Sequence, residues 1–190
     1  LRDGDFSQDV YKNNSWILDD KFMTYTTVLS EMEMTDLIKE LTKDENVERN
    51  DDRPDIAVIF SNDPNTSEKF DVVIIELKRK GLKSEDNIRV EAQLEKRARD
   101  LFAIYADKIQ SLWLYGVVEL DNDYKALLST AGYQPMYSKG NIFVHTGDIT
   151  VDWESRTKIP AVRYILDFDA LVNDADARNK TFLNIIKSKF

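Results

Sequence analysis

The sequence predicts an α/β domain with a mixed central sheet flanked by helices. Two short apolar runs rich in Val and Ile, residues 56–60 and 70–77, are typical of buried strands. Apolar residues with helical spacing follow at 84–107, and a third apolar run at 112–120 predicts another strand. This succession of strand and helix patterns is that of an α/β domain with a mixed sheet.

The composition fits one domain over residues 1–190, long enough to bury a core. The chain is 42% hydrophobic and 32% charged, and it contains no cysteine. The lack of cysteine excludes disulfides, thiolate zinc sites and cysteine nucleophiles, and it favours a reducing, cytoplasmic setting. No apolar run reaches the roughly 18 residues of a membrane-spanning helix, so we expect no membrane partner. Because the chain begins with Leu1, we expect it to be a fragment of a longer protein.

Within the domain we distinguish a helical segment at 1–30, a core at 31–120 and a C-terminal extension at 121–190. Apolar residues at i, i+3 and i+4 over residues 16–41 predict helices, with Ser30 as N-cap of the second. The Asn-Asp-Pro-Asn turn that begins at Asn62 joins the first two strands into a hairpin. Ser84 and Glu85 suit the first turn of the helix at 84–107.

The C-terminal part predicts smaller elements. Residues 121–131 form a short helix closed by Gly132, and residues 133–150 form two short strands around a turn. A strand at 162–166 then leads into an amphipathic helix. That helix either caps the domain or pairs with a partner, which would be a second copy in a homodimer or an attached domain.

Polar side chains stand at the ends of the first two strands. Asp55 opens the first strand, and Glu76 and Lys78 close the second. Because side chains alternate along a strand, Glu76 and Lys78 point to the same face. Antiparallel pairing of the two strands would bring Asp55 beside Glu76. Two carboxylates of this kind bind Mg²⁺ well, with Mn²⁺ as a substitute.

A metal held there would activate a water molecule and stabilise the charge that builds on a phosphate. Lys78 would position the attacking water, or help to deprotonate it, and would offset phosphate charge. The residues therefore predict a magnesium-dependent phosphodiesterase that needs no covalent nucleophile.

The constellation of Pro54-Asp55 with Glu76-Leu77-Lys78 resembles the PD-(D/E)xK superfamily of restriction-endonuclease-like nucleases, over roughly residues 31–120. The resemblance implies a restriction-endonuclease-like sheet, a metal-dependent endo- or exodeoxyribonuclease activity and DNA as partner. It also implies Asp55 and Glu76 as metal ligands and Lys78 as the catalytic or water-orienting group.

The same resemblance implies two auxiliary site residues. Family members often supply a further acid from the first helix, and here Glu31 is favoured over Glu33 and Glu40. Gln93 matches a glutamine that some members carry in the helix after Glu-x-Lys. Branches with a Gln-x-x-x-Tyr pattern have tyrosine where this chain has Arg97, so the chain departs from those exonucleases.

A local basic run follows the second strand. Arg79, Lys80 and Lys83 are candidate contacts to nucleic acid, although the net charge of −9 opposes binding by bulk electrostatics. The single histidine, His145, lies far from the motif in sequence, and we expect it to be structural. For the three tryptophans, burial is a better expectation than base stacking.

Two alternatives stand beside the nuclease hypothesis. One is a non-catalytic domain of the same fold that binds a partner, or assembles a larger protein, through its acidic surface and C-terminal helix. The other is a small-molecule phosphodiesterase or other metal hydrolase with the same site chemistry. The sequence leaves open the choice among DNA, RNA and a small substrate, and that between end and internal cutting.

Overall fold

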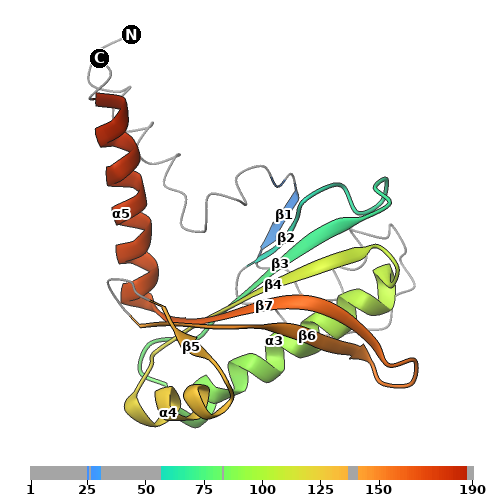
Figure 1. Cartoon of the computed structure of the whole chain (residues 1–190), viewed down its shortest axis with the longest axis horizontal. Coiled ribbons are helices and arrows are strands. Elements are labelled where there is room, and N and C mark those ends of the chain that lie inside the picture. The colour runs from blue at the N-terminus through green and yellow to red at the C-terminus, as the bar shows by residue number, and fades with distance from the viewer. Residues whose placement is uncertain (1–24, 26, 31–56, 83, 137–140, 188–190) are drawn as a thin grey trace.

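The computed structural model describes residues 25, 27–30, 57–82, 84–136 and 141–187. Over these residues the protein is α/β, with seven strands in one mixed sheet and three helices around it. The strand order is β1-β2-β3-β4-β7-β6-β5 (Figure 1). None of the described helices is long and apolar enough to cross a membrane.

The elements have the following bounds. The strands are β1 Thr27–Ser30, β2 Ala57–Phe60, β3 Phe70–Leu77, β4 Ile109–Val118, β5 Gln134–Pro135, β6 Ile142–Asp152 and β7 Thr157–Asp167. The helices are α3 Ser84–Tyr105, α4 Asn122–Thr130 and α5 Phe168–Lys187.

The sheet is parallel in its centre and antiparallel toward its edges. β2 pairs antiparallel with both β1 and β3, while β4 is parallel to both β3 and β7. β6 and β7 form an antiparallel hairpin, and the short β5 pairs with β6. Parallel neighbours need a crossover connection, and α3 supplies it between β3 and β4. β3 and β4 are therefore buried central strands whose carboxyl ends lie at the same end of the sheet.

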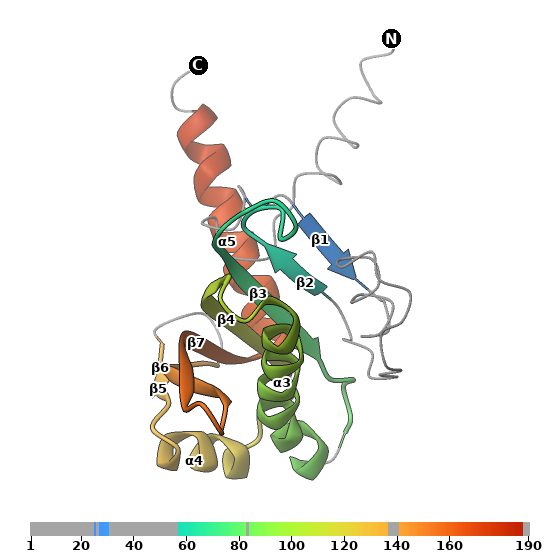
Figure 2. The same cartoon turned by 90° about the vertical axis from the view of Figure 1, so that its right-hand side faces the viewer.

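Two apolar layers cover the sheet. On one face, Val72 and Ile74 of β3 pack in one cluster with Val90, Leu94 and other residues of α3. On the other face, alternate residues of the same strands pack with the beginning of α5. Figures 1 and 2 show α3 lying along the sheet and α5 extending away from the end at which β7 stops.

Gly116 of β4 allows α3 to approach the sheet closely. A Cβ atom at this position would lie 2.8 Å from Cδ1 of Ile165 and 3.0 Å from Cγ2 of Val90. Gly116 is also the register partner of Glu76 on β3. The close contact therefore occurs beside the residue that the sequence motif singled out.

Most of the predicted elements are present. The apolar runs predicted at 56–60, 70–77 and 112–120 overlap β2, β3 and β4, and the helical pattern predicted at 84–107 overlaps α3. The short helix after residue 120 begins after the N-cap Asp121, and Gly132 follows it with φ of 86°. The amphipathic segment at the C-terminal end forms α5.

The helix prediction for residues 16–41 is wrong at Thr27–Ser30, which form β1. Thr27 and Val28 are β-branched and favour extended backbone, and their pairing with β2 outweighs the helical spacing of their apolar neighbours. Apart from Tyr25, the rest of that segment lies outside the described residues.

The two strands predicted at 133–150 are present as β5 and β6, which pair antiparallel, but the lengths predicted for β6 and for the strand at 162–166 are too short. β6 and β7 are 11 residues each and pair along most of their length. The turn between them contains neither glycine nor proline, the residues that usually mark a turn in a sequence. Asp152 builds the turn by accepting hydrogen bonds from the backbone N–H groups of Glu154 and Ser155, and Arg156 adopts φ of 59°. Because β7 lies beside β4, the segment expected as an extension continues the same sheet.

Candidate functional site

Glu76 is a fully buried carboxylate near the end of β3. Its neighbours two and four residues back, Ile74 and Val72, lie in the apolar layer under α3, so Glu76 faces α3 as well. A buried carboxylate is costly unless it is paired. Arg97 Nε donates to Oε2 of Glu76 at 2.8 Å, and Lys78 Nζ lies 3.4 Å from Oε1.

Lys78 is held in place by the sheet although it follows the last residue of β3. Its backbone N–H donates to the carbonyl oxygen of Val117 at 2.9 Å, which extends the pairing of β3 with β4 by one step. The side chain of Lys78 is 13% exposed, compared with 1% for that of Glu76. The ammonium group therefore lies between the buried carboxylate and the surface.

Arg97 is a site residue that sequence reasoning noted only as a departure from a family pattern. It lies on α3 with 4% of its surface exposed. A signal for its role was present, because Arg97 falls three residues after Leu94 and seven after Val90, on the buried side of the helix. An arginine on such a stripe requires an acidic partner, and that partner is Glu76.

Gln93 lies one helical turn before Arg97 on α3 and is partly buried. Its Oε1 atom is buried and accepts no hydrogen bond within the described part of the chain. The structure thus places Gln93 on the helix that bears Arg97 and leaves its acceptor available for a ligand or a water molecule.

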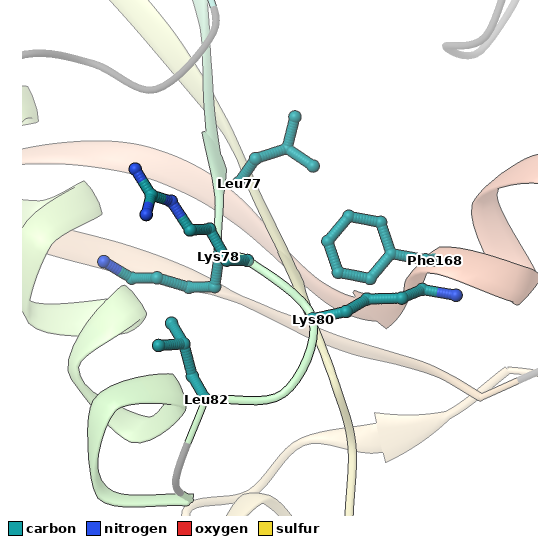
Figure 3. Close-up of a pocket in the computed structure, with 6 residues that line it drawn as sticks. Leu77, Lys78, Lys80, Leu82 and Phe168 are labelled. Carbon is teal, nitrogen blue, oxygen red and sulfur yellow. The ribbon is translucent and has the colours of Figure 1, made fainter.

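A surface hollow of about 710 Å³ opens beside Lys78. Its lining combines basic and apolar side chains: Leu77, Lys78, Arg79, Lys80, Leu82 and Phe168 (Figure 3). Phe168 comes from the start of α5, Leu77 is the last residue of β3, and the other residues come from the segment after β3. The predicted basic run is thereby brought to one hollow, with the exception of Lys83, which is outside the described residues.

Other predicted site residues cannot be placed in the same way. Asp55 and Glu31 lie outside the described residues, as do Glu33 and Glu40. Among the residues that the structure describes, no three His, Asp or Glu side chains gather in a way that could hold a metal. Glu76 is therefore the one described carboxylate of the proposed ligand pair.

A partly buried acid, Glu91, lies on α3 on the N-terminal side of Arg97. Glu91 accepts hydrogen bonds from the hydroxyls of Tyr124 at 3.3 Å and Tyr133 at 3.1 Å. Burial raises the pKa of Glu91, while the two hydroxyls act in the opposite direction. Burial likewise raises the pKa of both tyrosines. This cluster fastens α4 and the segment after it to α3.

His145 belongs to the β6–β7 hairpin and not to the site around Glu76. Its Nδ1 atom lies 2.8 Å from Nη1 of Arg163, its register partner, and Arg163 Nε lies 3.5 Å from Oε1 of Glu95. Trp113 packs against the core, whereas Trp153 is 69% exposed with the guanidinium of Arg156 4.0 Å from its ring. The expectation of burial is therefore wrong for Trp153, because it lies in the tight turn of the hairpin.

Comparisons of the chain with known protein families, curated proteins and solved structures gave no match.

Proposed function

We propose that this protein is a magnesium-dependent nuclease that hydrolyses DNA phosphodiester bonds. The observation that carries the proposal is the buried Glu76 carboxylate, which meets Lys78 at 3.4 Å where a basic hollow opens. Glu76 and Asp55 are the proposed metal ligands, and Lys78 is the proposed water-orienting group.

The pairing of β2 with β3 brings the chain that leads to Asp55, the proposed second ligand, to this end of β3. Ala57 pairs with Ile75, the residue before Glu76, and Asp55 precedes Ala57 by two positions in the sequence. Two peptide units span at most about 7 Å, so the covalent chain limits the distance of Asp55 from this end of β3. Two carboxylates with coordinated waters form the ligand set that Mg²⁺ prefers.

The element order also agrees with what the resemblance implies. The β2–β3 hairpin carries Glu76 at its end, α3 follows, and β4 then pairs parallel to β3. The acid and the lysine of the motif accordingly stand at the carboxyl end of a central strand, and α3 packs against the same face.

Each residue has a distinct chemical task in this proposal. Bound Mg²⁺ would lower the pKa of a coordinated water and offset the negative charge of the phosphate. Lys78 can donate to a phosphate oxygen or to the attacking water, because its ammonium lies between Glu76 and the surface. Arg97 holds the carboxylate of Glu76 in one orientation, as a positioning residue. Gln93 is the proposed donor or acceptor for a water molecule near this group.

The proposal is tested by incubating the protein with supercoiled plasmid and with single-stranded DNA in Mg²⁺, Mn²⁺ or EDTA. We expect cleavage with either metal, none in EDTA, and loss of cleavage in Glu76→Gln, Asp55→Asn and Lys78→Ala. Glu85→Gln is the matched control, because Glu85 is an exposed carboxylate on α3 and should be dispensable. Circular dichroism establishes that each variant is folded. Cleavage that survives Glu76→Gln, or that persists in EDTA, would overturn the proposal.

A second candidate function is a non-catalytic domain of this fold that binds a protein partner. The observation that favours it is the pairing of Glu76 with two cations, since such a group also serves as a purely structural ion pair. Thermal unfolding with and without Mg²⁺ separates the two, because a ligand that binds only the folded state raises Tm. The nuclease proposal expects a rise in Tm that Glu76→Gln abolishes, and the non-catalytic domain expects none.

A further inference from the structure

We propose that the hollow beside Lys78 binds one nucleotide of single-stranded DNA, with its phosphate at Arg79 and Lys78 and its base against Phe168. This inference deepens the proposed function and rests on it, because it places the bound strand next to Glu76.

The size and lining of the hollow suit a nucleotide. Its volume of about 710 Å³ lies within the range of roughly 300–1,000 Å³ that is typical of small-molecule sites. Three of the six lining residues are cationic, and the other three are apolar. A nucleotide has the same two-part character, with an anionic phosphate and a flat base that has apolar faces.

The cationic part is available to an anion. Arg79 is exposed and makes no ion pair with any other described residue. Its planar guanidinium suits two-point binding of a phosphate. Lys80 Nζ lies 3.4 Å from Asp169, but these side chains are 63% and 83% exposed, so water screens the pair.

The apolar part centres on the ring of Phe168. The ammonium of Lys80 lies 5.5 Å from the centroid of this ring, so one face of the ring meets a flexible side chain and not the core (Figure 3). A base that stacks on Phe168 would displace Lys80 from that face and leave it free for the phosphate. Stacking of this kind is a main source of affinity in proteins that bind single strands.

The junction of β7 with α5 fixes the position of Phe168. Oδ1 of Asp167 accepts the N–H of Ala170 at 2.8 Å, and Oδ2 accepts Nδ2 of Asn141 at 2.6 Å. These bonds hold Asp167, the residue before Phe168, at the end of the sheet. Phe168 itself packs against the apolar cluster that contains Leu166 and Ala170, so the ring is held before a ligand binds, which lowers the entropy lost on binding.

The geometry favours a single strand over a duplex. Within a duplex, both faces of each base are covered by its neighbours in the stack. A base reaches the face of Phe168 only when it is unstacked, as in a single strand or at a frayed end. We therefore expect single-stranded DNA to bind more tightly than blunt duplex DNA of the same length.

The test is fluorescence anisotropy with a labelled oligothymidylate and with an abasic oligomer that has the same phosphates and no bases. EDTA in the buffer prevents cleavage, so the measurement does not depend on catalysis. We expect Phe168→Leu and Phe168→Ala to weaken binding of the oligothymidylate by roughly tenfold and to leave binding of the abasic oligomer unchanged. Arg79→Ala should weaken both, and Phe168→Trp should retain the preference for bases.

Val172→Ala is the matched control, because Val172 lies on α5 one turn after Phe168 and is 64% exposed. Thermal unfolding of each variant checks that α5 remains docked. Equal binding of the two oligomers by the unsubstituted protein, or a Phe168→Leu variant that keeps its preference for bases, would overturn the inference. If cleavage fails while the base preference depends on Phe168, the nuclease proposal is rejected and the nucleotide subsite stands.

Discussion

The Nε atom of Arg97 lies 2.8 Å from Oε2 of Glu76, and the two side chains are 5% and 1% exposed. This ion pair joins α3 to β3 inside the protein, at the end of the sheet where the basic hollow opens. In a buried pair each charge depends on the other for compensation. The pair is therefore central to both the stability and the proposed chemistry of the site.

The first prediction concerns this pair. We expect Arg97→Met to lower the free energy of unfolding by about 3–5 kcal/mol, because it removes the cation that lies 2.8 Å from a buried carboxylate. The double variant Glu76→Leu with Arg97→Met should lose less than the sum of the two single changes. Urea denaturation of the four proteins gives the coupling free energy. Strictly additive losses would show that the two groups act independently.

A second prediction tests the close approach of α3 to the sheet. Gly116→Ala should lower the free energy of unfolding by about 1–3 kcal/mol, because the new methyl group would meet Cδ1 of Ile165 at 2.8 Å. Gly147→Ala serves as control, since its nearest neighbour would be Cε1 of His145 at 3.4 Å. Thermal unfolding of both variants makes the comparison. Equal effects at the two positions would contradict the close packing inferred at Gly116.

The start of α4 gives a third prediction. Oδ1 of Asp121 accepts the N–H of Tyr124 at 2.7 Å and caps the helix. Asp121→Ala should therefore destabilise the protein by about 1 kcal/mol. Asp123→Ala removes an exposed acid from the first turn without removing the cap, so it should cost less. Urea denaturation of the two variants measures both losses in the free energy of unfolding. A larger loss for Asp123→Ala than for Asp121→Ala would contradict the role of Asp121 as the cap.

A fourth prediction concerns pH and follows from Glu91. Burial raises the pKa of Glu91 in the folded protein above its value in the unfolded chain. The folded state therefore binds this proton more tightly, which stabilises the protein at low pH and is lost as pH rises through the folded-state pKa. Glu91→Gln cannot lose this proton, so its stability does not fall in the same way. The Tm of the variant minus the Tm of the unsubstituted protein should therefore increase as pH rises across the acid range.

The measurement is a series of thermal unfolding curves from acid to neutral pH. Glu68→Gln provides the control, because it removes an exposed carboxylate in the loop before β3. A Glu91→Gln variant whose Tm runs parallel to that of the unsubstituted protein would show that burial does not govern this carboxyl.

The sequence predicted the elements whose local pattern and tertiary environment agree. β3 is a continuous Val and Ile run because it is buried on both faces, and α3 has a regular apolar stripe because one side faces the sheet. The four-residue β1 was not predicted, for the opposite reason: its local pattern is helical, and only its pairing with β2 makes it a strand. The β6–β7 turn was missed because Asp152 forms it through side-chain hydrogen bonds that leave no glycine or proline in the sequence.

The site was predictable only in part. Strand alternation was enough to place Glu76 and Lys78 on one face, and their side chains do meet. The partnership of Glu76 with Arg97 joins residues 21 positions apart and depends on how deeply α3 packs, which Gly116 on a third element controls. Phe168 was likewise expected only as part of a helix face, because its place beside Lys80 depends on the insertion of β7 next to β4.

The position of β7 has a consequence for how the chain acquires its structure. β7 is the last strand in the described part of the sequence, yet it lies between β4 and β6. During synthesis, the N–H and C=O groups along one edge of β4 stay unpaired until the ribosome has made β7. Exposed edges of this kind invite pairing with other chains. A nascent chain halted before residue 157 should therefore aggregate or require a chaperone, and sheet closure should be a late folding step.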